Sequence, residues 1–188
     1  MESKKVNVRD LTILGMLSGI IVLLAYTPIG LIPLGPISAS TIHIPVIVGA
    51  LILGARKGAI LGGIMGTVTF IKSFAAAGWL DQFFRNPLVS ILPRVFIGIA
   101  AYYTFVWIKK LCKKDIAAYI TASIVGSLTN TVLTLGALVV ATGFAFPDKL
   151  QEVIALVGTI VSTGGIVEAI LTGIIVPPVV YALKKLKY

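Results

Sequence analysis

Six stretches of apolar residues run along the chain, separated by short polar or charged segments. They cover Leu11–Tyr26, Ile42–Ala55, Gly58–Ile71, Leu88–Ile108, Ile116–Ala141 and a long final stretch that ends near Leu183. A membrane-crossing helix needs about 20 mostly apolar residues, so the shorter stretches must extend into polar neighbours or be shielded by other helices. Pro45 and the pair Pro177–Pro178 are expected to kink or interrupt helices. The pattern predicts an all-α integral membrane protein with six transmembrane helices.

The basic residues predict how these helices are oriented. Cytoplasmic segments of membrane proteins carry an excess of lysine and arginine. Twelve of the 16 basic residues fall on one side of a six-helix arrangement: Lys4, Lys5, Arg9, Arg56, Lys57, Lys109, Lys110, Lys113, Lys114, Lys184, Lys185 and Lys187. The other side has only Lys72, Arg85 and Lys149. We therefore expect both termini to be cytoplasmic.

Composition supports a single membrane-embedded domain over residues 1–188. Hydrophobic residues make up 57% of the chain and charged residues 12%, whereas soluble domains average about 45–50% and about 25%. The net charge of +9 comes from lysine clusters at the edges of apolar stretches, so a membrane explains it better than nucleic acid does. We expect a multi-pass protein of the cell membrane. Cys112 is the only cysteine and cannot form an internal disulfide.

Polar residues from separate stretches are predicted to lie at one depth in the membrane. Counted from the cytoplasmic edges at about 1.5 Å per residue, they fall about 20–24 Å above that side. The hydrocarbon core is about 30 Å thick, so they form a layer in its outer third. This predicted layer contains Thr41, His43, Phe70, Arg94, Asn130 and Glu168.

Arg94 and Glu168 are the only charged residues at that depth, and two interpretations are open for them. Charges in a membrane span normally face the interior of the bundle and have partners. The two residues either form a structural ion pair or line an outward-open pocket in which Arg94 binds an anionic group of a ligand. Asn130 either joins helices or bonds the ligand, and His43 is either a hydrogen-bonded interfacial residue or a ligand contact.

Glycine spacing indicates two surfaces where helices approach closely. Gly15 and Gly19 lie one turn apart on the first helix, and Gly58, Gly62 and Gly66 repeat this spacing on the third. Small residues four apart allow close helix packing in membranes. Either set is compatible with packing inside the bundle or with docking of a partner membrane subunit.

The sequence lacks the motifs of several catalytic classes. It has no Walker-type phosphate loop, so the chain is not expected to hydrolyse ATP itself. It has no H-E-x-x-H motif and no His/Cys cluster, so no metal site or cofactor is expected. An intramembrane hydrolase would need His43 beside Ser38 or Ser40 and an oxyanion hole, and only the proximity in sequence supports that. We do not expect an enzyme.

Four segments of the chain resemble a known family. They are "TPIGLIPLGPISASTIHIPVIVGALILGARKGAILGGIMG" at 27–66, "LPRVFIG" at 92–98, "LTNTVL" at 128–133 and "GGIVEAILTGIIVPPVV" at 164–180. With them, the whole chain resembles the substrate-binding (S) components of energy-coupling-factor (ECF) vitamin transporters. Within that family it is most similar to the S components specific for pantothenate.

The resemblance implies a mechanism and partners. An S component binds a vitamin near the extracellular side and docks onto a transmembrane coupling protein that carries two cytoplasmic ATPase subunits. It then topples in the membrane to deliver the vitamin inward. The usual docking motif on the first helix is Ala-x-x-x-Ala, and here Gly15 and Gly19 occupy the matching positions.

The chemistry of pantothenate agrees with the predicted polar layer. Its carboxylate suits Arg94, whose guanidinium is a planar, permanently charged donor. Its hydroxyls and amide suit Asn130, Thr41 and His43, and Phe70 suits its dimethyl carbons. Glu168 would either hold Arg94 or accept a hydrogen bond from a ligand hydroxyl. Two alternatives remain: an S component for riboflavin or a pyridoxine-like compound, and an ion-coupled carrier.

Overall fold

The computed structural model describes residues 8–34, 37–75, 81–112 and 114–185, and nearly all of them are helical. Five helical segments are long and apolar enough to cross a membrane. They are Val8–Tyr26 (α1), Ala55–Ala75 (α3), Pro87–Cys112 (α4, Pro87–Ser90, and α5, Leu92–Cys112), Asp115–Ala145 (α6) and Pro147–Lys185. The last contains α7 (Leu150–Ile160), a π-helical turn (Val161–Gly165) and α8 (Ile166–Lys185). This is the architecture of a multi-pass membrane protein.

The predicted stretch Ile42–Ala55 forms a shorter helix than expected, and two strands precede it. Helix α2 covers only Ile44–Leu53, about 15 Å at 1.5 Å per residue. Before it come a 3-10 turn (Pro28–Gly30) and an antiparallel hairpin of β1 (Leu31–Leu34) and β2 (Ile37–Ser40), with Leu31 opposite Ser40. The all-α prediction missed this hairpin. Prolines at 28, 33 and 36 explain why no helix forms there, because each lacks a backbone N–H.

The prolines predicted to break helices act differently in the structure. Pro45 lies in the first turn of α2, where a missing N–H costs nothing. Helix α8 continues through Pro177 and Pro178 to Lys185, so these prolines do not interrupt it. Packing against neighbouring helices allows prolines inside a membrane helix.

Helix α2 lies in the core of the bundle. Eight of its ten residues are buried, and Val46 and Ile47 are fully enclosed. Around it pack Leu61 of α3, Ile97 of α5 and Val176 of α8. Surrounding helices thus shield a helix too short to span the hydrocarbon core alone.

The three glycines of α3 pack inside the bundle. A Cβ atom at Gly62 would collide with the carbonyl oxygen of Arg94, and one at Gly66 would lie 2.6 Å from Cα of Ile91. A Cβ atom at Gly58 would lie 2.5 Å from Cβ of Ala50. Of the two interpretations for this glycine set, the structure supports packing within the bundle.

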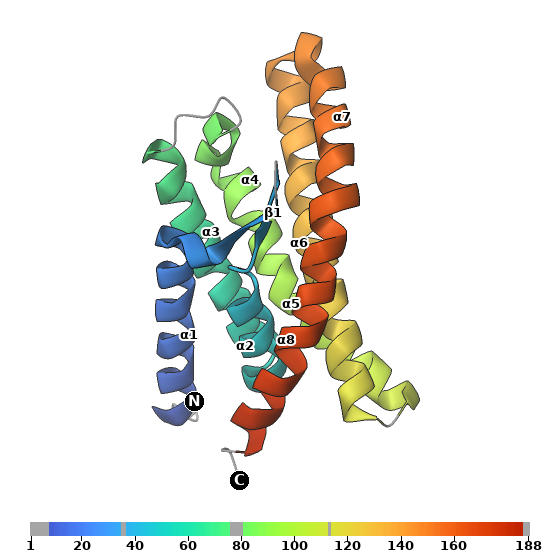
Figure 1. Cartoon of the computed structure of the whole chain (residues 1–188). Helices are drawn as coiled ribbons and strands as arrows, with labels where there is room; N and C mark the ends of the chain where they lie inside the picture. Colours follow the sequence, from blue (N-terminus) through green and yellow to red (C-terminus); the bar gives the residue numbers. More distant parts are fainter. Residues whose placement is uncertain (1–7, 35–36, 76–80, 113, 186–188) are drawn as a thin grey trace, which may run out of the picture.

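Several helix ends gather at one end of the bundle. Figure 1 shows the start of α1, the α5–α6 connection and the end of α8 at this end, and the α6–α7 connection at the opposite end. Lys57 at the start of α3 pairs with Asp10 at the start of α1. Lys184 near the end of α8 donates to the Tyr119 hydroxyl near the start of α6, at 2.9 Å. We call this end, which carries Arg56, Lys110, Lys114 and Lys185, the basic end.

Candidate binding site

A buried hydrogen-bond network joins the segment before α2 to helix α8. His43 is fully buried, and its Nε2 lies 2.9 Å from Oγ1 of Thr172. Thr172 donates its only hydroxyl proton to the backbone carbonyl of Glu168, at 2.6 Å. The proton between His43 and Thr172 must therefore come from Nε2 of the histidine. In the neutral ring, this leaves Nδ1 of His43 as a buried acceptor without a partner.

The Glu168 side chain is held by the hairpin. Its Oε1 accepts a hydrogen bond from the backbone N–H of Ser40, at 2.6 Å. Ser40 ends strand β2, so this bond ties the hairpin to the first turn of α8. The adjacent Thr41 donates through Oγ1 to the carbonyl of Ile29, at 3.3 Å, and so fixes the base of the hairpin.

Arg94 is buried near the start of α5 and forms no salt bridge with a described carboxylate. Only 5% of its surface is exposed. Its Nη1 donates to the carbonyl of Val89 at 2.8 Å, which is one of the carbonyls left without an intrahelical partner by the short helix α4. Its guanidinium carbon lies 5.3 Å from the ring centroid of Phe84, and its Nε has no hydrogen-bond partner.

The ion pair between Arg94 and Glu168, one of the two interpretations of these charges, does not occur in the described part of the chain. Arg94 is bound to a helix-end carbonyl and a ring, and Glu168 to a backbone amide. The interpretation of these charges as a structural pair is therefore wrong. Arg94 keeps a buried positive charge that no described residue neutralises.

Asn130 lies on α6, beside the π-helical turn. Its Oδ1 accepts a hydrogen bond from Thr134 of the same helix, at 3.4 Å. A Cβ atom at Gly165 in the π turn would lie 3.2 Å from Cγ2 of Thr131. This part of α6 therefore packs against the π turn, which precedes Glu168 in the chain. Asn130 thus makes no described hydrogen bond to another helix, and the structure does not support a helix-joining role for it.

Phe70 lies one turn before the end of α3 and is half-buried. Its ring packs edge-to-face against Phe74, with centroids 5.1 Å apart. Of the predicted site residues, the structure joins His43 and Glu168 in one network through Thr172, and Thr41 follows Ser40, which bonds Glu168. Among the described residues, Phe70, Arg94 and Asn130 make their side-chain contacts outside that network.

Sequence analysis missed Thr172, which connects His43 with Glu168. The spacing of Glu168 and Thr172 contained a signal, because residues four apart share one helix face. It also missed Ser127, which lies nearly one turn before Asn130 on α6 and is fully buried. Both are hydroxyl residues among apolar neighbours, and depth counting alone did not distinguish them from other threonines and serines.

Four buried polar atoms lack partners in the described structure. They are Oγ1 of Thr27, Nδ1 of His43, Nε of Arg94 and Oγ of Ser127. Buried polar atoms are nearly always hydrogen-bonded in folded proteins, so each unpaired one needs an explanation. They come from four separate segments and include both donors and acceptors. Each of these atoms has an unused hydrogen bond to offer to a polar ligand or a water molecule. The described residues contain no group of three His, Cys, Asp or Glu side chains that could hold a metal ion.

Comparison with known proteins identifies the family. Residues 9–183 match the family described as ECF transporter, substrate-specific component. The chain belongs to this family of S components. The resemblance found in the sequence is confirmed.

This S component is similar to two curated transporters. The pantothenic acid transporter PanT of Lactococcus lactis is 29% identical over 164 residues, which cover 80% of each chain. The pantothenate transporter PanT of Leuconostoc mesenteroides is 32% identical over 77 residues, which cover 40% of this chain and 37% of that protein.

In this S component, the glycine pair of α1 faces away from the bundle. Gly15 and Gly19 are exposed, and a Cβ atom at either would meet no other atom within 4 Å. The neighbouring side chains of Met16, Ile20 and Leu23 are 63%, 43% and 55% exposed. The glycine sets of α1 and α3 therefore differ, because only that of α1 is open to a partner.

Proposed function

We propose that this S component captures pantothenate on the extracellular side of the cell membrane for ATP-dependent import. The observation that carries the proposal is Arg94, a buried cation that has an unpaired Nε and no carboxylate partner among the described residues. A buried charge is costly unless it is paired. The carboxylate of the vitamin would supply the missing anion. The names of the two relatives support pantothenate as that vitamin.

Other groups of the protein suit the hydroxyls, the amide and the dimethyl carbons of pantothenate. Nδ1 of His43 would accept a hydrogen bond from a ligand hydroxyl or amide. Glu168 uses one oxygen on Ser40, so its other oxygen would accept from a second hydroxyl. Asn130 and Thr41 would add polar contacts, and Phe70 would cover the dimethyl carbons.

The basic end would face the cytoplasm, with both termini there, and α2 with its hairpin would count as the sixth crossing segment. A transmembrane coupling protein would dock on the Gly15–Gly19 face, and two cytoplasmic ATPase subunits would supply the energy.

Uptake competition tests the function. A pantothenate auxotroph would express this chain with a coupling protein and its ATPases, and labelled pantothenate uptake would be measured. We expect unlabelled pantothenate to compete, and riboflavin and pyridoxine not to compete. Stronger competition by either of those vitamins would reassign the substrate. Uptake by this chain without any partner would indicate an ion-coupled carrier instead.

We expect Asn130→Ala to weaken pantothenate binding about 5- to 30-fold. Loss of one good hydrogen bond to a ligand costs roughly 1–2 kcal/mol. The thermal midpoint of the ligand-free protein in detergent should stay nearly unchanged, because the only described bond of Asn130 is a long one within α6. Isothermal titration and thermal unfolding measure the two quantities. A lowered midpoint with unchanged affinity would assign Asn130 to helix packing.

We expect Thr172→Val to weaken pantothenate binding about tenfold and to lower the thermal midpoint. Valine keeps the shape of threonine but leaves Nε2 of His43 without its acceptor, which costs roughly 1–3 kcal/mol. Thr159→Val is the matched control, because Thr159 is exposed on α7 and its hydroxyl donates to the Ala155 carbonyl of the same helix. Equal effects of the two changes would contradict a positioning role for Thr172.

A further inference from the structure

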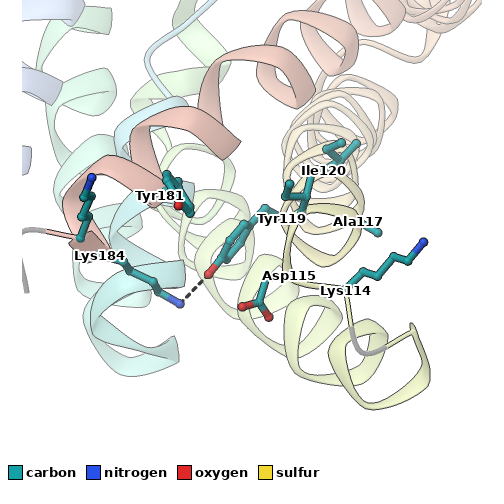
Figure 2. Close-up of a pocket in the computed structure, with 9 residues that line it drawn as sticks. Lys114, Asp115, Ala117, Tyr119, Ile120, Tyr181 and Lys184 are labelled. Atoms are coloured by element: carbon teal, nitrogen blue, oxygen red, sulfur yellow. Dashed lines mark hydrogen bonds between the residues drawn. The ribbon is translucent and has the colours of Figure 1, made fainter. Parts of the chain in front are cut away.

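A cleft opens at the basic end of the bundle, between the start of α6 and the end of α8. Its volume is about 910 Å³, within the range of small-molecule sites. In Figure 2, Tyr119 of α6 and Lys184 of α8 reach toward each other across it, with Tyr181 beside them. The polar network at Thr172 lies 12 residues earlier on α8, about 18 Å away along the helix. The cleft is therefore separate from the candidate vitamin site.

The charges that line the cleft are mainly positive. Lys114, Lys184 and Lys185 line it, and Asp115 is the only carboxylate among its described lining residues. Asp115 is already paired with Lys109, at 3.0 Å. Lys114 and Lys185 are exposed and make no ion pair with any residue that the structure describes. The cleft is therefore suited to an anion.

One of these cations is fixed in position by aromatic rings. Nζ of Lys184 lies 5.0 Å from the ring centroids of both Phe105 and Tyr119, which stack on each other. It also donates to the Tyr119 hydroxyl, at 2.9 Å. That hydroxyl accepts the bond through its oxygen, so its own proton remains to donate to an oxygen of the ligand.

The cleft continues into a wholly apolar pocket. This pocket of about 290 Å³ shares Ile116, Tyr119 and Tyr181 with the cleft and adds Pro177 and Pro178. Pro178 precedes Lys184 by six residues, so it lies about 9 Å farther from the basic end. Ile116 and Tyr181 are 65% and 66% exposed. The combined site is cationic at the end of the bundle and apolar toward its middle.

We propose that this cleft binds an anionic phospholipid. Lys114, Lys184, Lys185 and the Tyr119 hydroxyl hold the phosphate, and an acyl chain lies against Ile116 and Pro177–Pro178. Basic pockets between membrane helices bind anionic headgroups in this way. A lipid fits better than a protein segment, because the cationic and apolar parts follow each other along the direction in which a phospholipid lies in the membrane.

Native mass spectrometry of the detergent-solubilised chain tests the proposal, with phosphatidylglycerol and phosphatidylcholine as probes. We expect a preference for phosphatidylglycerol. Lys114→Gln/Lys185→Gln should weaken phosphatidylglycerol binding about 25-fold, since each lysine near an anionic surface contributes about fivefold. Arg56→Gln/Lys110→Gln is the matched control. It removes the same charge from exposed positions at the same end, outside the cleft, and should change binding less than twofold.

A second variant tests the shape of the site without changing its charge. Ala117→Trp places a large ring in the cleft, and it should abolish the preference for phosphatidylglycerol while leaving pantothenate affinity intact. If that variant does not fold, Ile120→Trp serves the same purpose. Three results would overturn the proposal. They are equal losses in the two double variants, no preference between the lipids, and displacement of the lipid when inorganic phosphate is added.

Discussion

Arg94→Ala should raise the Kd for pantothenate at least about 30-fold. Removing one partner of a buried charge pair costs roughly 2–5 kcal/mol, and Arg94 is the only buried lysine or arginine among the described residues. Arg94→Lys should also weaken binding, because an ammonium cannot reproduce the planar fork of the guanidinium. Calorimetric titration of each variant with pantothenate measures the change.

Arg85→Lys provides the matched control for this experiment. Arg85 also donates to a backbone carbonyl, that of Ser73 at 3.3 Å, and lies 5.6 Å from the ring of Phe74. It is exposed, however, so its replacement should leave affinity unchanged. Unaltered binding by folded Arg94→Ala would remove Arg94 from the site.

A ligand analogue separates anchoring from stability. In the wild-type protein, replacing the carboxylate of pantothenate by an alcohol should weaken binding strongly. In Arg94→Ala the acid and the alcohol should bind equally, because the cation that distinguishes them is gone. If Arg94 only supports α4 through the Val89 carbonyl, the variant will still distinguish the two ligands.

Gly15→Leu or Gly19→Leu should abolish ATP-dependent uptake while ligand binding by the isolated chain stays intact. A Cβ atom at either position would meet no neighbouring atom of the bundle within 4 Å, so the bundle should fold normally. A leucine there would hold a partner helix away and remove the close packing that drives association in lipid. Binding and uptake would be measured on the same preparation.

Two other glycines provide controls for this prediction. Gly136 of α6 is equally exposed and unobstructed, so Gly136→Leu should leave both binding and uptake unchanged. Gly62→Leu should fail to fold, because the new side chain would overlap the Arg94 backbone. Retained uptake in Gly15→Leu and Gly19→Leu would place the docking surface elsewhere. Parallel loss of pantothenate binding would show that the α1 face supports the fold of this chain.

The membrane character, the main helices and the family could all be predicted from the amino-acid sequence. An apolar environment leaves no water to bond the backbone, so long apolar stretches must be helical. Five of the six predicted stretches, including the long final one, correspond to helical segments long enough to cross a membrane. The segment at 27–53 was the exception, because its prolines favour a turn and hairpin that hydropathy does not reveal.

The contacts of the folded chain were needed to show which polar and small residues face one another. Counting residues along a helix estimates depth in the membrane, but it does not set the rotation of that helix about its axis. Arg94 and Glu168 were therefore placed at one level, yet the fold directs one to Val89 and Phe84 and the other to Ser40. The two glycine sets have the same spacing, and only packing shows that α3 uses its set inside the bundle whereas α1 exposes its own. Spacing records which residues share a helix face, and the contacts of the folded chain determine what that face meets.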